Sequence, residues 1–331
     1  MRKRKMNKKK IALIFGLSIA FYSQAEDVAT ESNASATTSP EASTPAATAT
    51  EERSMPTSQI NRIRGLINQL SQNQSHEIRT LNANGEDFLA LFRDATRDPQ
   101  GCIILLHGDT EHPDWPSVIN PVRTTLNSNS WCSLSIEIPD VYPKESLTLA
   151  VAPEETEPTA STENQVFSLP NEETIFARID TAIEFLTEQD FTTFAILGHR
   201  TGASYAIKYS ADKELTDGAL LLIAPIAPEE VSSFELSNII SATQLPILDY
   251  YFDTSVKESR FAQARQSAAN KREEGLVYQQ IKAFQDQRYQ AAGEKRLTQR
   301  VWGFLKQNTP QKDQRRPLPS IQKGLFHQPK F

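Results

Sequence analysis

The nine residues Ala195-Ile196-Leu197-Gly198-His199-Arg200-Thr201-Gly202-Ala203 decide the fold. An apolar run over 192–197 is typical of a buried strand, and a helical pattern begins at Ala203 without an intervening loop. Gly198 and Gly202 stand two residues either side of Arg200. This spacing predicts a turn so tight that a side chain at either glycine would strike the neighbouring strand or helix.

Around this turn the chain alternates short strand-like runs with helical ones. Strands are predicted over 102–106, 131–138, 192–197, 218–223, 246–252 and 276–283, and helices over 116–127, 172–188, 203–210 and 296–306. Before them, 77–81 and 87–92 flank Asn84-Gly85, a dipeptide that favours a hairpin turn. The predicted fold class is α/β, specifically an α/β-hydrolase-like fold. It has a mostly parallel central sheet, helices on both faces and an N-terminal antiparallel hairpin.

The turn at Arg200 resembles a nucleophile elbow, in which an α/β-hydrolase presents Ser, Cys or Asp. Arg200 cannot be that nucleophile, because its guanidinium stays protonated and offers no lone pair. The fold places a catalytic acid after the penultimate strand and a His after the last one. Asp249 and Asp253 suit the acid, but the sequence has no His between 276 and 306. Two of three catalytic positions are therefore missing, and no catalytic residue is assigned.

The residues at the ends of the central strands are candidates for a binding pocket instead. They are Gly198, His199, Arg200, Thr201, Gly202, His107, Gly108, His112 and Asp249. Ligands of α/β folds bind at the carboxyl ends of the strands, where a helix N-terminus favours anions. With the positive charge of Arg200, this predicts a pocket for a carboxylate or phosphate group. The competing interpretation is a degenerate site in which Arg200 pairs with a carboxylate such as Asp109 or Asp249.

Cys102 and Cys132 are the only cysteines, and each opens a predicted strand. A disulfide between them and two free thiols are both open, because side-by-side parallel strands seldom suit a disulfide. Residues 107–114 include several types of metal ligand, but their spacing matches no known metal motif. Neither a metal site nor another cofactor is predicted.

Residues 1–25 have the form of a signal peptide. Seven basic residues precede an apolar run over 11–22, and Ser23 and Ala25 are small residues at the positions that a signal peptidase reads. The run is shorter than the roughly 20 residues that span a bilayer. We therefore expect cleavage after Ala25, no stable membrane anchor, and a periplasmic or secreted protein.

The mature chain expected from this cleavage is strongly acidic. Removal of seven basic residues from a total of 35 leaves 28 Lys and Arg against 41 Asp and Glu, a net charge of −13. Such a surface repels phosphate backbones and anionic lipids, so nucleic acid and membrane surfaces are not expected partners. A small anionic ligand or a partner protein is expected instead.

Three segments are expected to be disordered because they offer little apolar surface to bury. They are a tether over 26–56, an acidic insertion over 143–171 and a basic tail over 307–331. After the tether, 57–72 carries apolar residues at helical spacing, which predicts one amphipathic helix that docks on the domain at 76–306.

Five stretches make the chain resemble a bacterial family of exported α/β-hydrolase-like proteins of unknown function. They are 88–91, 105–108 with 112–116, 197–203, 245–249 and 300–305. The resemblance spans the domain and implies the fold, but no settled reaction. The chain departs further from that family in having no His between its last strand and residue 306; the only later one is His327 in the tail.

Three functions fit these features to different degrees. A non-catalytic binding or scaffolding protein needs only the fold and a surface, and it explains the missing nucleophile and His. An esterase-like enzyme would need a relocated nucleophile, for which Thr201 and Ser204 are the nearby hydroxyls. A metal-dependent hydrolase would need the carboxylates and His side chains of 107–114 to converge.

Overall fold

The computed structural model describes residues 57–141, 167–283 and 290–311. The expected signal peptide and tether, most of the acidic insertion and nearly all of the basic tail lie outside the described residues.

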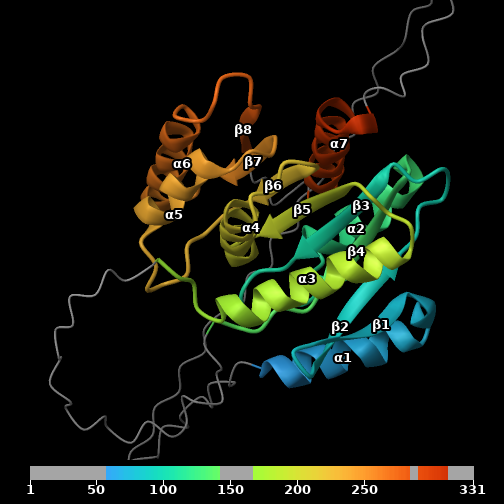
Figure 1. Ribbon diagram of the computed structural model, residues 1–331. Helices are drawn as coiled ribbons and strands as arrows, with labels where there is room; N and C mark the ends of the chain where they lie inside the picture. The colour runs from blue at the N-terminus through green and yellow to red at the C-terminus, as the bar shows by residue number, and fades with distance from the viewer. Residues whose placement is uncertain (1–56, 142–166, 284–289, 312–331) are drawn as a thin grey trace, which may run out of the picture. The chain divides into compact units, whose positions relative to one another are not determined.

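The described strands form one eight-stranded sheet in the order β1-β2-β4-β3-β5-β6-β7-β8 (Figure 1). The strands are β1 (Ile78–Ala83), β2 (Glu86–Arg93), β3 (Gly101–Leu106), β4 (Trp131–Ile136), β5 (Phe194–His199), β6 (Ala219–Ile223), β7 (Ile247–Phe252) and β8 (Tyr278–Ala283). Strands β4, β3, β5, β6, β7 and β8 pair in parallel, whereas β2 pairs antiparallel with both β1 and β4. The predicted fold class is confirmed.

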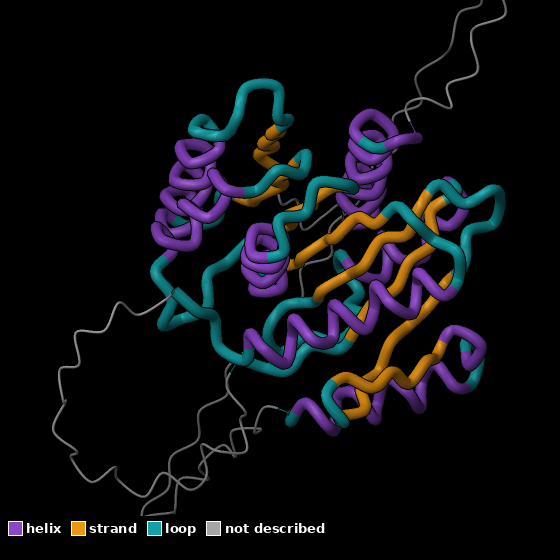
Figure 2. Tube along the Cα trace, in the orientation of Figure 1, coloured by secondary structure: helices purple, strands orange, loops and turns teal. Residues whose placement is uncertain are grey.

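The helices are α1 (Gln59–Ser71), α2 (Ile119–Leu126), α3 (Glu172–Glu188), α4 (Thr201–Asp212), α5 (Ser233–Ile239), α6 (Val256–Ala269) and α7 (Gln290–Asn308). Short 3-10 turns are η1 (Ser75–Glu77), η2 (Asn127–Asn129) and η4 (Ile240–Ala242). Helices cover both faces of the sheet (Figure 2).

Alternation along the buried strands builds a core on each face. In β3, Ile103 and Leu105 belong to the cluster that includes α2 and α7. Ile104 and Leu106 belong to the opposite cluster, which includes α3, α4, α5 and α6. Successive side chains of a strand point to opposite faces, so a run that is apolar throughout must be covered twice.

The hairpin turn forms where Asn84-Gly85 predicts it. Asn84 has φ 52° and Gly85 has φ 85°. A tight two-residue hairpin turn needs positive φ at both central positions, which Asn and Gly tolerate best.

Helix α1 packs on the outer part of the sheet. Ile63, Leu66 and Leu70 pack with Leu89 and Leu91 of β2 in a third apolar cluster. The helical spacing of its apolar residues therefore reflects a buried face on the domain.

Helices α5 and α6 were not predicted. The buried face of α6 is made mainly of alanines and Phe261, which give a weak periodic signal. Each helix nevertheless begins with Ser-x-x-Glu: the side chain of Ser232 accepts from the backbone N–H of Glu235, and that of Ser255 accepts from the N–H of Glu258. These capping sequences were the available signal.

Cys102 and Cys132 form a disulfide across β3 and β4. The two residues are direct partners in the parallel register, with their Cα atoms 4.5 Å apart. Of the two hypotheses left open by the sequence, the structure contains the disulfide.

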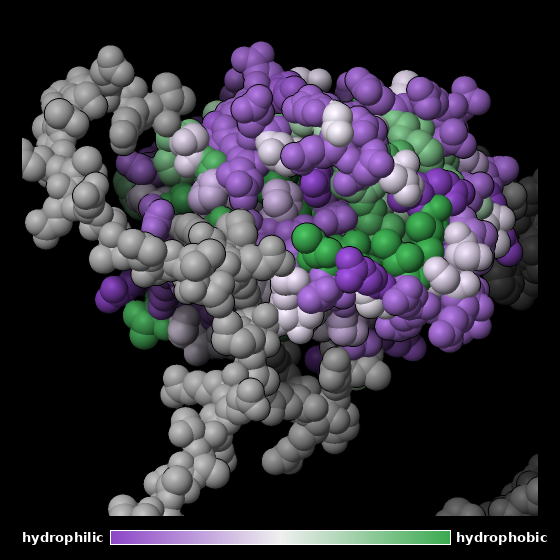
Figure 3. All heavy atoms as spheres, turned by 90° about the horizontal axis from the view of Figure 1, so that it is seen from below, coloured by the Kyte–Doolittle hydropathy of each residue, from purple (hydrophilic) through white to green (hydrophobic). Residues whose placement is uncertain are grey.

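On the face in Figure 3, hydrophilic residues predominate, with a band and smaller patches of hydrophobic residues among them. Within the described residues, no helix combines the length and apolar character needed to span a membrane.

Candidate functional site

The turn between β5 and α4 has the geometry of a nucleophile elbow. Arg200 has φ 52° and ψ −119°, a backbone conformation that non-glycine residues rarely adopt. A Cβ at Gly198 would lie 2.3 Å from the Cα of Ala203, and one at Gly202 would lie 2.4 Å from the carbonyl oxygen of His107. The predicted reason for both glycines holds, and the elbow is intact around an arginine.

Glu111 is the centre of the polar cluster beneath the elbow. Its carboxylate is buried, and Oε2 lies 2.7 Å from Nδ1 of His199 and accepts the backbone N–H of Gly108 at 2.7 Å. Oε1 lies 3.8 Å from Nε of Arg200. The competing interpretation, in which Arg200 pairs with a carboxylate such as Asp109 or Asp249, was right about the pairing but wrong about those two residues, because the partner is Glu111 on the loop after β3.

The backbone N–H groups of the same loop are bound by side chains. In α/β-hydrolases, a backbone N–H from the loop after β3 helps to bind the oxyanion. Here the N–H of Gly108 donates to Glu111, and the N–H of Asp109 donates to Oγ1 of Thr201 at 2.6 Å. The next N–H, of Thr110, donates to Asp140 at 3.1 Å. Side chains of this chain therefore occupy the N–H donors of the loop after β3.

The hydroxyls closest to the elbow also make structural hydrogen bonds. Oγ1 of Thr201 accepts from Asp109, as described, and the fully buried Ser204 donates to the carbonyl oxygen of Ile226 at 2.8 Å. Neither hydroxyl is placed as a relocated nucleophile with a neighbouring His base.

His107 connects two loops rather than facing a ligand. Its Nδ1 donates to the carbonyl oxygen of Gly108 at 2.8 Å, and its Nε2 accepts from the N–H of Ile138 at 3.1 Å. Burial lowers the pKa of His107 from 6.5 to about 4, which keeps the imidazole neutral and able to make both bonds. His107 therefore positions the loops after β3 and β4.

His112 lies outside the cavity at the elbow. Its ring packs edge-on against Trp115 at 5.4 Å, and its Nδ1 accepts from the N–H of Asp114 at 3.2 Å. Burial is the main cause that lowers the pKa of His112. The sequence grouped His112 with the pocket residues, but the structure does not bring it to them.

Asp249 is also a structural residue. It lies inside β7, fully buried, and accepts from Nε and Nη2 of Arg265 at 2.8 and 3.0 Å. Tyr278 and Gln280 of β8 donate to it as well. Burial and then this carboxylate raise the pKa of Tyr278. The prediction of a ligand-facing Asp249 was wrong, because α6, missed from sequence, supplies its partner.

Asp253 occupies the position after β7 where the fold places a catalytic acid. It is exposed, and hydrogen bonds from Lys282 and Ser259 lower its pKa. The six residues that follow β8, 284–289, contain no His. An acid is present, but residues 284–306 provide no His base for it to orient.

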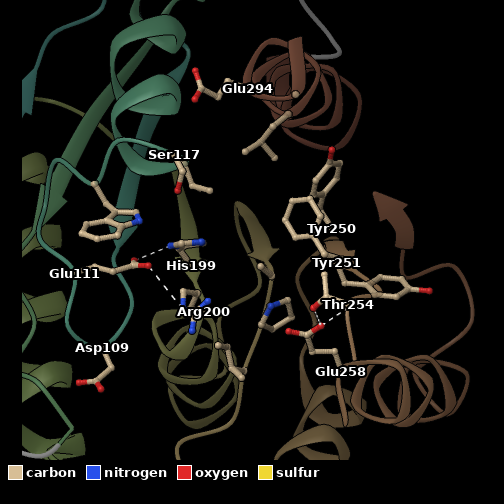
Figure 4. Close-up of a pocket in the computed structure, with 18 of the residues that line it drawn as sticks. Asp109, Glu111, Ser117, His199, Arg200, Tyr250, Tyr251, Thr254, Glu258 and Glu294 are labelled. Atoms are coloured by element: carbon tan, nitrogen blue, oxygen red, sulfur yellow. Dashed lines mark hydrogen bonds and ion pairs between the residues drawn. The ribbon is translucent and has the colours of Figure 1, made fainter. Parts of the chain in front are cut away.

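A cavity of about 790 Å³ opens at the carboxyl edge of the sheet beside the elbow. Glu111, His199 and Arg200 lie on one side, and Tyr250 and Tyr251 of β7 on the other (Figure 4). Helices α6 and α7 add further lining residues, which are Glu258, Arg265, Gly293, Glu294 and Leu297. Its size is that of a typical small-molecule site.

The residues that sequence reasoning missed come from three places. Glu111 was considered only as a metal ligand, and Tyr250 and Tyr251 only as part of a strand. Arg265 and Glu258 lie on the unpredicted α6. Nothing in their local sequence indicates that these residues meet, since they lie far apart in the chain.

The acidic and His residues of 107–114 do not form a metal site. His107 uses both ring nitrogens in hydrogen bonds, and Asp114 pairs with the buried Arg123 through Nη2 at 2.6 Å. No group of three or more His, Cys, Asp or Glu side chains within the described parts of the chain could hold a metal ion. These contacts do not favour the metal-dependent alternative.

The sheet order, the elbow and the cavity at the carboxyl edge define an α/β-hydrolase-fold protein. The chain belongs to the family described as "Protein of unknown function (DUF3530)", whose profile matches residues 10–307. No curated protein has a significantly similar sequence.

Solved structures of similar shape include several hydrolases. A dienelactone hydrolase from Anabaena variabilis has 12% identity and a TM-score of 0.50, with 71% of this chain and 100% of that chain covered. Est1E from Butyrivibrio proteoclasticus has 12% identity and a TM-score of 0.48, with 69% and 98% covered. A monoglyceride lipase from Saccharomyces cerevisiae has 10% identity and a TM-score of 0.47, with 70% and 95% covered. At such identities these likenesses concern the fold alone.

Proposed function

We propose that this protein is an exported ligand-binding protein that keeps the α/β-hydrolase fold without its acyl-transfer chemistry. One observation carries the proposal: groups that a hydrolase would use at the elbow and in the loop after β3 are bound by side chains of this chain. Arg200 stands at the nucleophile position beside Glu111, and the N–H groups of Gly108 and Asp109 are bound by Glu111 and Thr201. The cavity beside them is intact, so binding is the function that the site still supports.

Two features support the proposed export. The basic and apolar pattern of residues 1–25 is that of a cleaved signal peptide. The disulfide between Cys102 and Cys132 suits an oxidising compartment, where such bonds persist. Mass spectrometry of the protein recovered from the periplasm or medium should find Glu26 as its first residue; an intact Met1 in the cytoplasmic fraction would contradict export.

The ligand-binding role can be tested through the cavity wall. Gly293 lines the cavity on α7, and a Cβ there would meet nothing within 4 Å. Gly293→Phe should fill cavity space without a clash at its Cβ, whereas Gly303→Phe on the same helix changes a glycine outside the cavity with equally open surroundings. We expect a thermal-shift screen of small molecules, anions included, to find a ligand that stabilises the wild type and Gly303→Phe but not Gly293→Phe. A screen in which every hit also stabilises Gly293→Phe would remove the support for a binding cavity.

The absence of acyl transfer can be tested with a panel of short-to-long acyl esters. We expect no turnover by the folded wild type. Turnover that is lost in Arg200→Ala, Thr201→Ala or His107→Ala would instead locate a rearranged catalytic site and establish the esterase-like alternative.

A further inference from the structure

His199 presents an unsatisfied acceptor to the cavity. The residue is 5% exposed, and its Nδ1 donates to Glu111 at 2.7 Å. In the neutral imidazole this bond leaves the lone pair on Nε2. Nε2 makes no hydrogen bond to any residue that the structure describes, and the ring lines the cavity (Figure 4). A ligand that pairs with this nitrogen must therefore offer a hydrogen-bond donor.

Arg200, the next residue, presents donors to the same space. Its side chain is 51% exposed, and its ion pair with Glu111 is long at 3.8 Å. A guanidinium has five N–H donors and no acceptor. A ligand that contacts both side chains must therefore offer a donor to His199 and an acceptor to Arg200, close together. A pair of adjacent hydroxyl groups supplies both.

The charges around the cavity are of both signs. Among its lining residues the acids are Asp109, Glu111, Glu258 and Glu294, and the bases are Arg200 and Arg265. Arg265 already contacts both carboxylate oxygens of Asp249. Nη1 of Arg265 is nevertheless buried without a hydrogen-bond partner, so it remains available as a donor. Arg296 and Arg300 also lie near Tyr250, where they oppose the burial that raises its pKa. The positive and negative charges around the cavity therefore nearly balance, which favours a neutral ligand over an ion of either sign.

The opposite wall is aromatic. Tyr250, Tyr251 and Phe252 of β7 line it, and burial raises the pKa of Tyr250, which keeps its hydroxyl protonated. Aromatic rings bury the apolar face of a ligand while their hydroxyls hydrogen-bond. A sugar ring combines such an apolar C–H face with hydroxyl groups at its edge.

We propose that this cavity binds a neutral polyhydroxylated molecule with an apolar face, of the saccharide class, with one hydroxyl donating to Nε2 of His199 and a neighbouring oxygen accepting from Arg200. This assignment rests on the proposed binding function, and it replaces the anion expected from sequence by a neutral ligand.

A matched set of phenyl glycosides tests the assignment by isothermal titration calorimetry on the purified protein. The neutral probes are the phenyl glycosides of glucose, galactose, mannose and N-acetylglucosamine; the anionic probe is phenyl glucuronide, which differs from the glucoside only by a carboxylate at C6. We expect at least one neutral probe to bind with one-to-one stoichiometry and at least tenfold more tightly than the glucuronide.

Two variants assign the binding to the named atoms. In His199→Asn the amide can still donate to Glu111 but places no acceptor at the position of Nε2, so we expect affinity to fall at least tenfold with little change in the unfolding temperature. Arg200→Met keeps most of the half-exposed stem without the donors, and should weaken binding at least threefold. Gly303→Phe should bind as the wild type does. If His199→Asn does not fold, Arg200→Met carries the test.

Other outcomes overturn the assignment. Equal or tighter binding of the glucuronide would restore an anionic ligand, and binding of none of the probes would exclude this class. If both His199→Asn and Arg200→Met bind the probe as tightly as the wild type does, the ligand must bind elsewhere. Each of these results leaves the proposed binding function intact if the small-molecule screen finds a ligand of another class that Gly293→Phe abolishes; a screen without such a hit would overturn the function itself.

Discussion

Arg200 has the backbone conformation of a nucleophile at an elbow, but its side chain is a cation. Its positive φ is maintained by the strand and helix on either side, while its guanidinium lies near Glu111. Backbone conformations of this kind cost of order 1–3 kcal/mol and persist when their surroundings impose them. The elbow is therefore maintained as a structural turn with an arginine in place of the nucleophile.

Restoring a serine at this position should not restore an esterase. We expect Arg200→Ser to show no ester turnover and no covalent labelling by a fluorophosphonate probe. The reason is that no His lies between β8 and residue 306, and the loop N–H groups are bound to Glu111 and Thr201. An active serine esterase labelled in parallel provides the control. Stoichiometric labelling of folded Arg200→Ser would show that a base and an oxyanion site exist after all.

His107 should make stability depend on pH. Its pKa is about 4 in the folded protein, below its ordinary value of 6.5, so the unfolded state binds more protons between these values. The stabilisation is full above the unfolded pKa and is lost as pH falls toward the folded one. For this group we expect a loss of about 2 kcal/mol in the free energy of unfolding between about pH 7 and pH 5.

Urea denaturation of the wild type and His107→Gln at both pH values measures this contribution. The glutamine amide can keep a donor for Gly108 and an acceptor for Ile138, but it does not titrate. The variant should lose less stability on acidification than the wild type does. Equal losses would mean that His107 is not the group responsible.

At the scale of elements, the β5-turn-α4 unit depends on close backbone approach. The missing side chain of Gly202 lets α4 pass beside the end of β3, where a Cβ would lie 2.4 and 2.5 Å from the carbonyl oxygens of His107 and Leu106. Gly202→Ala should destabilise the protein by at least about 2 kcal/mol, since a backbone cannot yield as a side chain can. Chemical denaturation measures this change.

Gly65→Ala is the matched control for that substitution. Gly65 lies inside α1, and a Cβ there would meet nothing within 4 Å. The change should stabilise the protein by about 0.5–1 kcal/mol through the helix propensity of alanine. Similar effects of the two substitutions would show that the approach of α4 to β3 is looser than described.

For the whole molecule, the disulfide joins β3 to β4 near the centre of the sheet. It closes a segment with a sequence separation of 30 residues. Restricting the unfolded chain in this way should contribute roughly 2–4 kcal/mol. We expect the Cys102→Ala/Cys132→Ala double variant to lose that much free energy of unfolding. Reductant in the denaturation series should lower the free energy of unfolding of the wild type and leave that of the variant unchanged. If reductant does not change the value for the wild type, the disulfide does not contribute to stability.

Much of the fold was predictable because its signals are local. Continuous apolar runs marked the buried strands, Asn84-Gly85 marked the hairpin, and Gly198 and Gly202 marked the elbow. Helices α5 and α6 were not predicted, because α5 is short and the buried face of α6 is rich in alanine. Both features weaken the periodic pattern of apolar residues. The predicted ligand class depended on a single residue, Arg200, whose surroundings a linear pattern does not contain.

The sequence by itself determined the individual buried strands, the tight turn at Arg200, the arginine at the centre of that turn and the absence of a His between 276 and 306, because each depends on residue type and short spacing. Only the tertiary structure decided that Glu111 binds His199 and Arg200, that Asp249 is held by Arg265, and that aromatic rings face them across a cavity. These partners come from segments that are distant in the chain and meet only when parallel strands end at the same edge of the sheet.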